Sequence, residues 1–467
     1  MSDVPVSEWE RLRALGFDLV YLMGMWKRST TGRLLSRSQL PLLSRYDEAL
    51  PGWTLDDVAG SPFSIERYEP DPLIGSPADL ESIRRRLHDL GMRLILDFVP
   101  NHTGQDHPWI RERPEYYIRG DLVAYRQAPG GFFMSESANG ESQVIAYGRD
   151  PNFAPWTDTA QLNYFNPELR AAMIGQIHQI SQFCDGARCD MAMLLLNDNF
   201  HQNWEPFLQN ATVPAEEFWR EATRSLPDFI WMAEAYSDSE WALQQLGFNF
   251  TYDKRFYDRL RDGFVRDIYL HLKADSEFQS RSVRFLENHD EGRAATVFGK
   301  NRLPAVAVLA CTVPGMHFIN EGQIEGLGTE AVVQLARARD ESTESDIAKL
   351  YERILKIADD AEFHGGNWSL LEIEDSGDHS ASDLIAYLWT GESGHRLVVV
   401  NLGAGVSTGR IYLSDEMISS ASSVRFEDLL NDRVYERQAS DLKEWGLFIK
   451  LRGFAAHVFA TPMQKAS

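Results

Sequence analysis

Apolar residues recur along most of the chain in one repeating unit, a helix-period stripe followed by a turn residue and a short apolar strand. The clearest helix covers residues 78–91, where leucine and isoleucine side chains share one face and Gly91 ends the helix. Seven apolar runs are predicted strands: 18–25, 92–98, 186–192, 229–236, 248–254, 282–290 and 315–322. Helices that alternate with strands in this way are typical of βα units around a parallel sheet.

Two segments depart from this alternation. Residues 103–165 are rich in Pro, Gly, Asn and aromatic residues and have no sustained period, which indicates a long excursion over one face of a barrel. After about residue 366 the helical pattern disappears, and apolar runs separated by turn residues predict a small antiparallel β-sandwich. We therefore expect a catalytic barrel from residues 1–102 and 166–365, an excursion at 103–165, and a C-terminal β-sandwich at 366–467.

Charge and composition narrow the classes of partner. The 467 residues include 46 basic and 69 acidic side chains, a formal net charge of −23. This charge repels nucleic acid and anionic membranes, so we expect neither as a partner, whereas a neutral or cationic ligand is favoured. No apolar run reaches the roughly 18 residues that span a bilayer, and the first residues do not resemble a signal peptide, which predicts a cytoplasmic protein. The sequence carries no signal for an oligomeric state.

The three cysteines give no sign of a disulfide framework or a metal site. Cys184, Cys189 and Cys311 lack the CxxC spacing of metal-binding cysteines, and three residues are too few for a framework. We interpret them as small core residues.

Four of the predicted strands end in an acidic residue: Asp97, Asp190, Glu234 and Asp290. In a parallel barrel the C-terminal ends of all strands open to one mouth, so these carboxylates could converge. Polar neighbours flank three of the four acids: Asn101, His102, Arg188 and His289. Paired carboxylates with Arg and His suit glycosidic chemistry, in which one carboxylate attacks the anomeric carbon and another protonates the leaving oxygen. A single strand-end acid is more often a helix cap, so the inference depends on the four together.

These motifs resemble those of the α-amylase family, glycoside hydrolase family 13. DFVPNH (97–102), GARCDMA (186–192), FIWMAEAY (229–236) and FLENHD (285–290) are similar to its four signatures and follow their order. QLN at 161–163 approximates a fifth signature, in which the family usually has Asp in place of Gln161. The excursion and the C-terminal region lie where the family has its domains B and C. The resemblance implies a TIM (β/α)8-type barrel and a retaining α-glycosidase that acts on α-glucans or short α-glucosides through a covalent glycosyl-enzyme intermediate.

The resemblance also assigns the three acids of the reaction. Asp190 is the expected nucleophile, Glu234 the general acid/base and Asp290 the stabiliser of the transition state. Arg188 should keep Asp190 ionised, because alternate residues of a strand point to the same side, although an ion pair inside the barrel is the alternative. The apolar and aromatic neighbours of Glu234 should favour its protonated form until it acts as an acid.

The expected substrate-binding residues are Asp97, His102, Arg188, His289 and Phe63. A hydrogen bond within the core is an equal alternative for either histidine, and core packing is an equal alternative for the Phe63 ring, which has the place of the family's stacking tyrosine. Asn101 is interpreted as a residue that braces its loop.

Departures from the family concern the metal and the exact function. Classic α-amylases carry Lys and His where this chain has Met193 and Leu194, and that His binds calcium through its backbone. We therefore expect no cofactor and nearly unchanged activity in chelators, although a backbone carbonyl could still bind calcium. A transglycosylase or sugar isomerase of the trehalose synthase or glucanotransferase type uses the same scaffold and is the alternative function. A non-catalytic glucan-binding protein is the third hypothesis.

The start of the chain leaves a further choice open. The family's barrel has eight strands, yet only about six residues precede the first predicted helix, and the run at 18–25 has the position of strand two. Either the coding sequence begins upstream or the barrel has seven strands. We expect a chain extended upstream by roughly 15 to 25 residues to be more soluble and more active.

Overall fold

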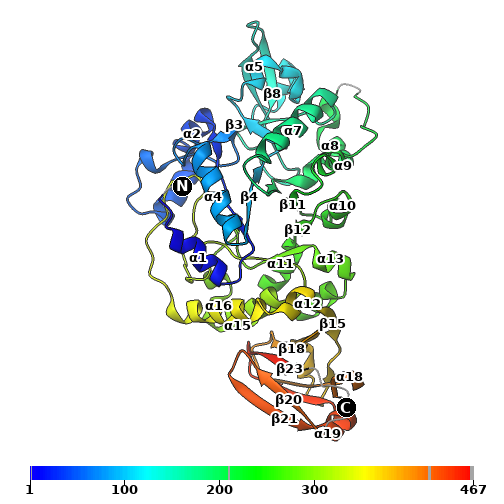
Figure 1. Ribbon diagram of the computed structural model, residues 1–467. Helices are drawn as coiled ribbons and strands as arrows, with labels where there is room; N and C mark the ends of the chain where they lie inside the picture. The colour runs from blue at the N-terminus through cyan, green and yellow to red at the C-terminus, as the bar shows by residue number, and fades with distance from the viewer. Residues whose placement is uncertain (2, 209–210, 419–421, 463–467) are drawn as a thin grey trace. The chain divides into compact units, whose positions relative to one another are not determined.

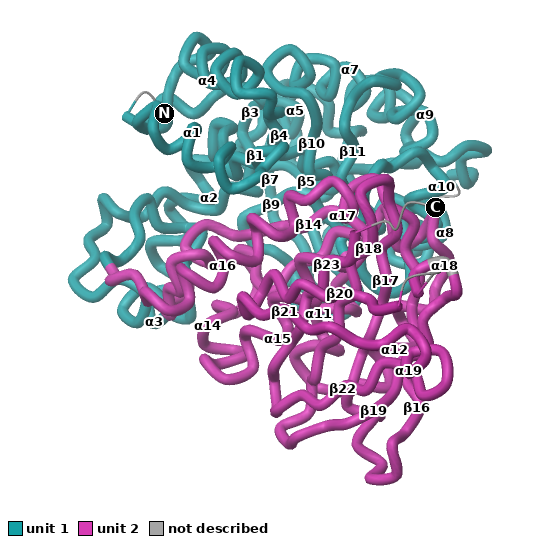
Figure 2. Tube along the Cα trace, turned by 60° about the horizontal axis from the view of Figure 1, so that its bottom comes forward, with its two compact units in different colours: residues 1–252, 331–340 teal, residues 253–330, 341–467 magenta. Residues whose placement is uncertain are grey.

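The computed structural model describes residues 1, 3–208, 211–418 and 422–462 and divides into two compact units. Unit 1 consists of residues 1–252 and 331–340, and unit 2 consists of residues 253–330 and 341–467 (Figure 2). The domain limits expected from the sequence remain a prediction.

All seven predicted parallel strands are present among the described residues. Unit 1 contains a parallel sheet whose strands follow one another in chain order: β1 (Leu19–Tyr21), β4 (Arg93–Phe98), β10 (Gly186–Cys189), β11 (Ile230–Ala233) and β12 (Phe250–Tyr252). Unit 2 contains the parallel pair β13 (Ser282–Phe285) and β14 (Met316–Phe318). Sequential parallel strands joined by helices are the construction of a (β/α) barrel, so the predicted fold class is confirmed.

Helices precede these strands as the apolar pattern predicts (Figure 1). Unit 1 has α1 (Val6–Ala14), α2 (Thr30–Ser36), α3 (Leu40–Ala49), α4 (Pro77–Asp89), α7 (Pro167–Ile180), α8 (Asn197–Trp204), α9 (Phe218–Ser225) and α10 (Glu240–Gln245). Unit 2 has α11 (Lys254–Asp262), α12 (Val265–Leu272), α13 (Ser276–Ser280), α14 (Ala294–Val297), α15 (Gly299–Thr312), α16 (Ser345–Ala358) and α17 (Ala361–Gly365).

Local sequence explains why α4 and β10 form where they do. The Ser76 hydroxyl accepts from the backbone N–H of Asp79, and the Asp79 carboxylate accepts from the N–H of Ser76, which is a capping box. Three apolar side chains of α4 are buried and Gly91 ends the helix with φ +77°. At Gly186 a Cβ would lie 2.4 Å from the carbonyl oxygen of Ile230. Only glycine therefore allows β10 to approach β11 at this point.

The excursion contains more regular structure than its sequence indicates. The short strands β5 (His102–Gly104) and β9 (Thr159–Gln161) pair with each other, and β6 (Arg119–Gly120), β8 (Ser142–Ala146) and β7 (Phe132–Glu136) form a separate sheet in that order. The helices are α5 (Trp109–Glu112) and α6 (Leu122–Gln127). Strands of two to five residues are too short to give a sustained period. Figure 1 shows α5 and β8 projecting beyond β3 (Ile65–Pro70), which pairs with β2 (Trp26–Arg28).

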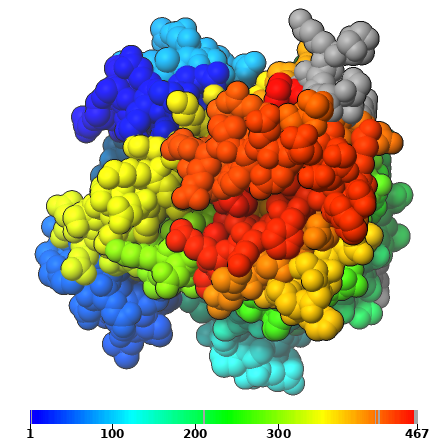
Figure 3. Space-filling view, turned by 90° about the horizontal axis from the view of Figure 1, so that it is seen from below, coloured from blue at the N-terminus to red at the C-terminus, as the bar shows by residue number. Residues whose placement is uncertain are grey.

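The C-terminal region is the predicted antiparallel β-sandwich. One sheet has the order β15 (Asn367–Leu371), β17 (Leu384–Gly391), β18 (Gly394–Asn401), β23 (Ala456–Pro462), β20 (Ser423–Asp428) and β21 (Arg433–Gln438). The other has the order β16 (Glu374–Asp375), β19 (Ser407–Ile411) and β22 (Leu447–Leu451). Apolar residues from both sheets form one core. Residues of this region, coloured orange to red, cover a continuous part of the face shown in Figure 3.

The expectation that helices disappear after residue 366 is wrong. The structure has α18 (Asp415–Ile418) and α19 (Ala439–Trp445), which lie between strands of the sandwich and bury apolar residues in its core. Helices of four and seven residues are too short for a pattern of period 3.6 to be recognised. As predicted, all three cysteines are buried free thiols. None of the helices in the described part of the chain is long and apolar enough to cross a membrane.

Candidate active site

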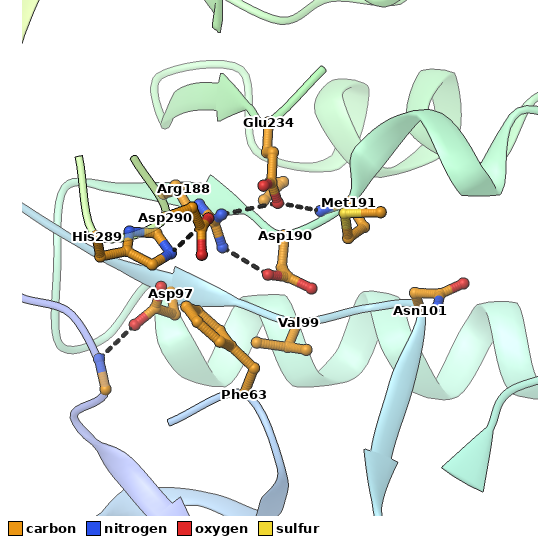
Figure 4. Close-up of polar contacts among 12 residues, drawn as sticks. Phe63, Asp97, Val99, Asn101, Arg188, Asp190, Met191, Glu234, His289 and Asp290 are labelled. Carbon is orange, nitrogen blue, oxygen red and sulfur yellow. Dashed lines mark hydrogen bonds and ion pairs between the residues drawn. The ribbon is translucent and has the colours of Figure 1, made fainter. Parts of the chain in front are cut away.

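Arg188 lies at the centre of the carboxylates of unit 1. Its Nη1 contacts Oδ1 of Asp190 at 2.6 Å, and its Nη2 contacts Oε2 of Glu234 at 2.7 Å (Figure 4). The register of the parallel sheet explains this position, because Arg188 on β10 pairs with Asp97 of β4 and with Met232 of β11. One guanidinium therefore holds both residues that were expected to act as nucleophile and acid/base.

Burial makes this contact a strong one. The Arg188 side chain is 1% exposed, that of Asp190 6% and that of Glu234 4%. Burial opposes the charge of Arg188, but the charges of Glu234 and Asp190 outweigh it and raise the pKa of the guanidinium well above its usual value. Arg188 thus remains a fixed cation at every pH at which the protein is folded.

The surroundings of Glu234 differ from the expectation. The residues Trp231 to Ala233 and Ala235 are buried and apolar, as predicted. The carboxylate itself, however, accepts from the backbone N–H of Met191 and from the hydroxyl of Tyr236, each at 2.7 Å, in addition to its contact with Arg188. An apolar environment is therefore the wrong description of the carboxylate, because backbone and side-chain donors reach it from β10 and from the residues after β11.

Met191 has an unusual backbone that serves this contact. Its φ of 46° and ψ of 40° are left-handed, which costs a residue with a Cβ about 1 kcal/mol or more. This conformation turns the chain directly after Asp190, and the N–H of Met191 donates to Glu234. Strained backbone of this kind is found most often where function requires a particular geometry.

Asp97 is anchored within unit 1. Its Oδ1 accepts from the hydroxyl of Tyr21 and its Oδ2 from the backbone N–H of Gly24 at 2.6 Å, and its side chain is fully buried. Burial, together with the charge of Asp97, raises the pKa of the Tyr21 phenol well above its usual value, so this phenol stays a donor. These contacts favour a positioning role for Asp97 over a direct contact with sugar.

His102 and Phe63 are joined by a hydrogen bond near Arg188. His102 hydrogen-bonds the backbone of Phe63, and its ring packs at a tilt on Trp156 with 5.1 Å between centroids. Burial lowers the pKa of His102 to about 4, so the imidazole is neutral near pH 7. The Cζ atom of Arg188 lies 5.1 Å from the centre of the Phe63 ring, which is half-buried. Phe63 therefore covers one face of the site's cation.

Asn101 and Gln161 form a closed pair of amides. Gln161 Nε2 donates to the backbone carbonyl of Asn101 at 2.9 Å and to its Oδ1 at 3.0 Å, and Asn101 Nδ2 donates to Gln161 Oε1 at 3.3 Å. These contacts join the residue before β5 to the end of β9 and match a residue that braces its loop.

The oxygen atoms near Asn101 are already used in hydrogen bonds within the described residues. The oxygen atoms of Asn101 accept N–H groups from Gln161, and within residues 1, 3–208, 211–418 and 422–462 no three His, Cys, Asp or Glu side chains are placed to hold a metal ion. The expected lack of a cofactor remains a prediction.

His289 and Asp290 belong to unit 2, where a turn after β13 presents them. Asn288 Oδ1 accepts from the backbone N–H of Asp290 at 2.8 Å and from that of Glu291 at 3.0 Å. His289 Nε2 lies 3.0 Å from Asp290 Oδ2, a contact drawn in Figure 4. Asp290 is half exposed, so its carboxylate can reach a ligand.

Sequence reasoning missed Tyr21, Gly24, Met191, Tyr236 and Asn288. Tyr236 and Asn288 lie within the quoted signatures, so their polar groups could have been considered. Tyr21 and Gly24 are distant from Asp97 in sequence, and the contact of Met191 depends on its backbone angles, so no pattern in the sequence indicates these three.

Comparisons with known proteins identify the family of the chain. Residues 64–369 match the sequence family described as the alpha amylase catalytic domain. An alignment of 285 residues with alpha-amylase 3 of Dictyoglomus thermophilum is 24% identical and covers 56% of this chain and 52% of that protein. An alignment of 308 residues with an alpha-glucosidase of Candida albicans is 27% identical and covers 54% of each. The chain thus spans about half the length of these two relatives.

A solved structure supports the fold along nearly the whole chain. The crystal structure of a noncanonic maltogenic alpha-amylase from Thermotoga neapolitana superposes with a TM-score of 0.71 at 22% identity, covering 98% of this chain and 94% of that one. At this identity the likeness concerns the fold alone. Because the matched catalytic domain covers well over half of the 467 residues, the chain belongs to the α-amylase family of glycoside hydrolases, glycoside hydrolase family 13.

Proposed function

We propose that the chain is a retaining α-glycosidase that acts on α-glucans or short α-glucosides. The observation that carries the proposal is the bridge from Arg188 to both Asp190 and Glu234. Two carboxyl groups on one guanidinium suit the separation of about 5 to 5.5 Å in retaining enzymes better than the roughly 6.5 to 9.5 Å of inverting enzymes. The names of the two relatives, an α-amylase and an α-glucosidase, support the substrate class.

The first half of the reaction forms a covalent intermediate. An oxygen of Asp190 attacks the anomeric carbon, the glycosidic C–O bond breaks, and the leaving oxygen takes a proton from Glu234. Arg188 keeps Asp190 ionised and oriented until its oxygen bonds to the anomeric carbon and the carboxylate becomes a neutral ester. By its place in the fourth signature, Asp290 is the proposed stabiliser of the oxocarbenium-like transition state.

The second half reverses these roles. Glu234, now a carboxylate, takes a proton from water as the water oxygen attacks the anomeric carbon, and the bond to Asp190 breaks. The product keeps the α configuration and both acids return to their starting states. If a sugar hydroxyl replaces water, the same steps give transfer to an acceptor.

Proton NMR of the first minutes of turnover on maltotriose tests the proposal. The α-anomer should appear first and mutarotate to the β-anomer afterwards. An initial β-anomer would show inversion and refute the mechanism. Chromatography of the same samples distinguishes hydrolysis from transfer, because transfer gives products longer than the substrate.

A matched pair of variants tests the nucleophile. Asp190 and Asp185 lie at opposite ends of β10, and Asp185 pairs with Arg84 at 2.8 Å rather than with Arg188. Asp190→Asn should abolish turnover while the fold is kept, whereas Asp185→Asn should lower stability and leave turnover measurable. Equal turnover of the two variants would contradict the assignment.

A further inference from the structure

The two carboxylate oxygens of Glu234 have different partners. Oε2 lies 2.7 Å from Arg188 Nη2 and accepts from the backbone N–H of Met191 at 2.7 Å. Oε1 accepts from the hydroxyl of Tyr236 at 2.7 Å. Both partners of Oε2 are donors that cannot accept, whereas a phenol hydroxyl can donate and accept.

This asymmetry decides where Glu234 can hold a proton. A proton on Oε2 would point at an N–H group or at a guanidinium, which would replace two favourable contacts by repulsion. A proton on Oε1 meets a hydroxyl that can rotate and accept it. Oε1 is therefore the oxygen from which a proton can leave towards a glycosidic oxygen.

We propose that Oε1 of Glu234 carries the catalytic proton and that Tyr236 is a positioning residue for this oxygen. The inference rests on the proposed function, because it assigns one atom and one supporting residue to the acid/base step. When Glu234 is ionised, the Tyr236 hydroxyl donates to Oε1. When Glu234 is protonated, that hydroxyl turns its own hydrogen away, and the proton on Oε1 is free to move to the leaving group.

Three other neighbours of Glu234 cannot both donate to and accept from its carboxyl group in the working range of pH. Arg188 is a fixed cation on the Oε2 side, with Asp190 on its other nitrogen. His102, whose pKa is lowered to about 4 by burial despite the nearby charge of Glu234, is neutral in the working range. The left-handed backbone of Met191 fixes Oε2 by a group that cannot titrate. The Tyr236 hydroxyl, in contrast, lies on the Oε1 side and can adapt to both protonation states.

Tyr236→Phe removes the hydroxyl and keeps the ring. Losing a donor to the carboxylate disfavours the ionised form, so the basic limb of the kcat/KM profile should move up by about one pH unit. At the plateau, kcat/KM should fall roughly tenfold for maltotriose, whose leaving sugar needs a proton. For 4-nitrophenyl α-glucoside, whose phenolate leaves without one, kcat/KM should change by less than about twofold. Equal losses on both substrates with an unmoved limb would overturn the inference.

A second readout does not depend on turnover. Carbon NMR of protein labelled at glutamate Cδ follows the titration of Glu234. The signal of Glu234 is the one that is absent from the spectrum of Glu234→Gln. The midpoint in Tyr236→Phe should be higher than in the wild type, and an unchanged midpoint would overturn the inference. If the wild type cleaved neither substrate, the proposed function would be refuted, while the titration would still show whether Tyr236 controls the protonation of Glu234.

Tyr164→Phe is the matched control. The Tyr164 hydroxyl is buried and donates to the carbonyl of Pro100 at 2.8 Å, and it contacts none of the acids in any described hydrogen bond. This variant should lose some stability but keep the pH profile and the ratio of the two substrates. A shifted limb in Tyr164→Phe would show that loss of a buried phenol hydroxyl is enough, and would overturn the role of Tyr236.

Discussion

Replacing Arg188 by Met should leave the two buried carboxylates of Asp190 and Glu234 without their shared cation. The side chains of Asp190 and Glu234 are 6% and 4% exposed and would lose contacts of 2.6 and 2.7 Å with one guanidinium. Hydrogen bonds to charged groups contribute about 1.5 to 3 kcal/mol each, and removing one partner from a buried ion pair costs about 3 to 5 kcal/mol. We therefore expect unit 1 to lose about 3 to 5 kcal/mol of stability at pH 7, a melting shift of roughly 6 to 10 °C.

The loss of stability in Arg188→Met should depend on pH. In Arg188→Met the two acids are buried without a cation, so protonating them relieves the penalty as the pH falls. The difference in melting temperature between the variant and the wild type should therefore narrow from pH 7 to pH 5. Arg188→Lys keeps the charge, but a compact ammonium lacks the fork that reaches both acids at once, so it should recover only part of the loss.

Thermal melts at pH 5, 6 and 7, followed by calorimetry, measure these differences. The control is Arg84→Met, which removes the contacts with Asp185 at the other end of β10, where the arginine is partly exposed. This exchange should cost less than Arg188→Met, because Arg84 is 27% exposed and Asp185 keeps its contacts with His88 and with the N–H of Leu94. An Arg188→Met variant as stable as the wild type at pH 7, or a difference that widens on acidification, would refute the reasoning.

Three further predictions concern other parts of unit 1. Burial lowers the pKa of His102 from 6.5 to about 4, so the unfolded chain binds the proton first as the pH falls, and up to about 3 kcal/mol of stability is lost between pH 6.5 and 4. The stability of His102→Gln, measured by urea melts, should therefore depend less on pH over this range. An unchanged dependence of stability on pH would contradict this prediction. Gly186→Ala should destabilise by about 2 to 3 kcal/mol in urea melts, because its Cβ would meet the Ile230 carbonyl oxygen at 2.4 Å, and a neutral result would show that β11 moves aside. Activity and melting temperature should be nearly unchanged in EDTA, and a loss that added calcium restores would disprove the reading of the amide pair at Asn101 and Gln161.

The sequence by itself determined where the parallel strands lie and which acids stand at or near their ends. The seven predicted apolar runs are parallel strands in the structure. A strand buried between helices needs apolar side chains on both faces, so it can be recognised from a short stretch of sequence. Asp97, Asp190, Glu234 and Asp290 could be named because each lies at or after the end of such a run. The pair of Arg188 and Asp190 was also predictable, since residues two apart on a strand point to the same side.

Only the tertiary structure decided which groups surround each acid. The contact of Arg188 with Glu234 depends on the register of β10 against β11, and the anchoring of Asp97 by Tyr21 and Gly24 joins residues more than 70 positions apart. The small sheet of the excursion and helices α18 and α19 were missed for a related reason. Elements of a few residues are stabilised mainly by what they pack against, so their own sequence contains too little periodicity to reveal them.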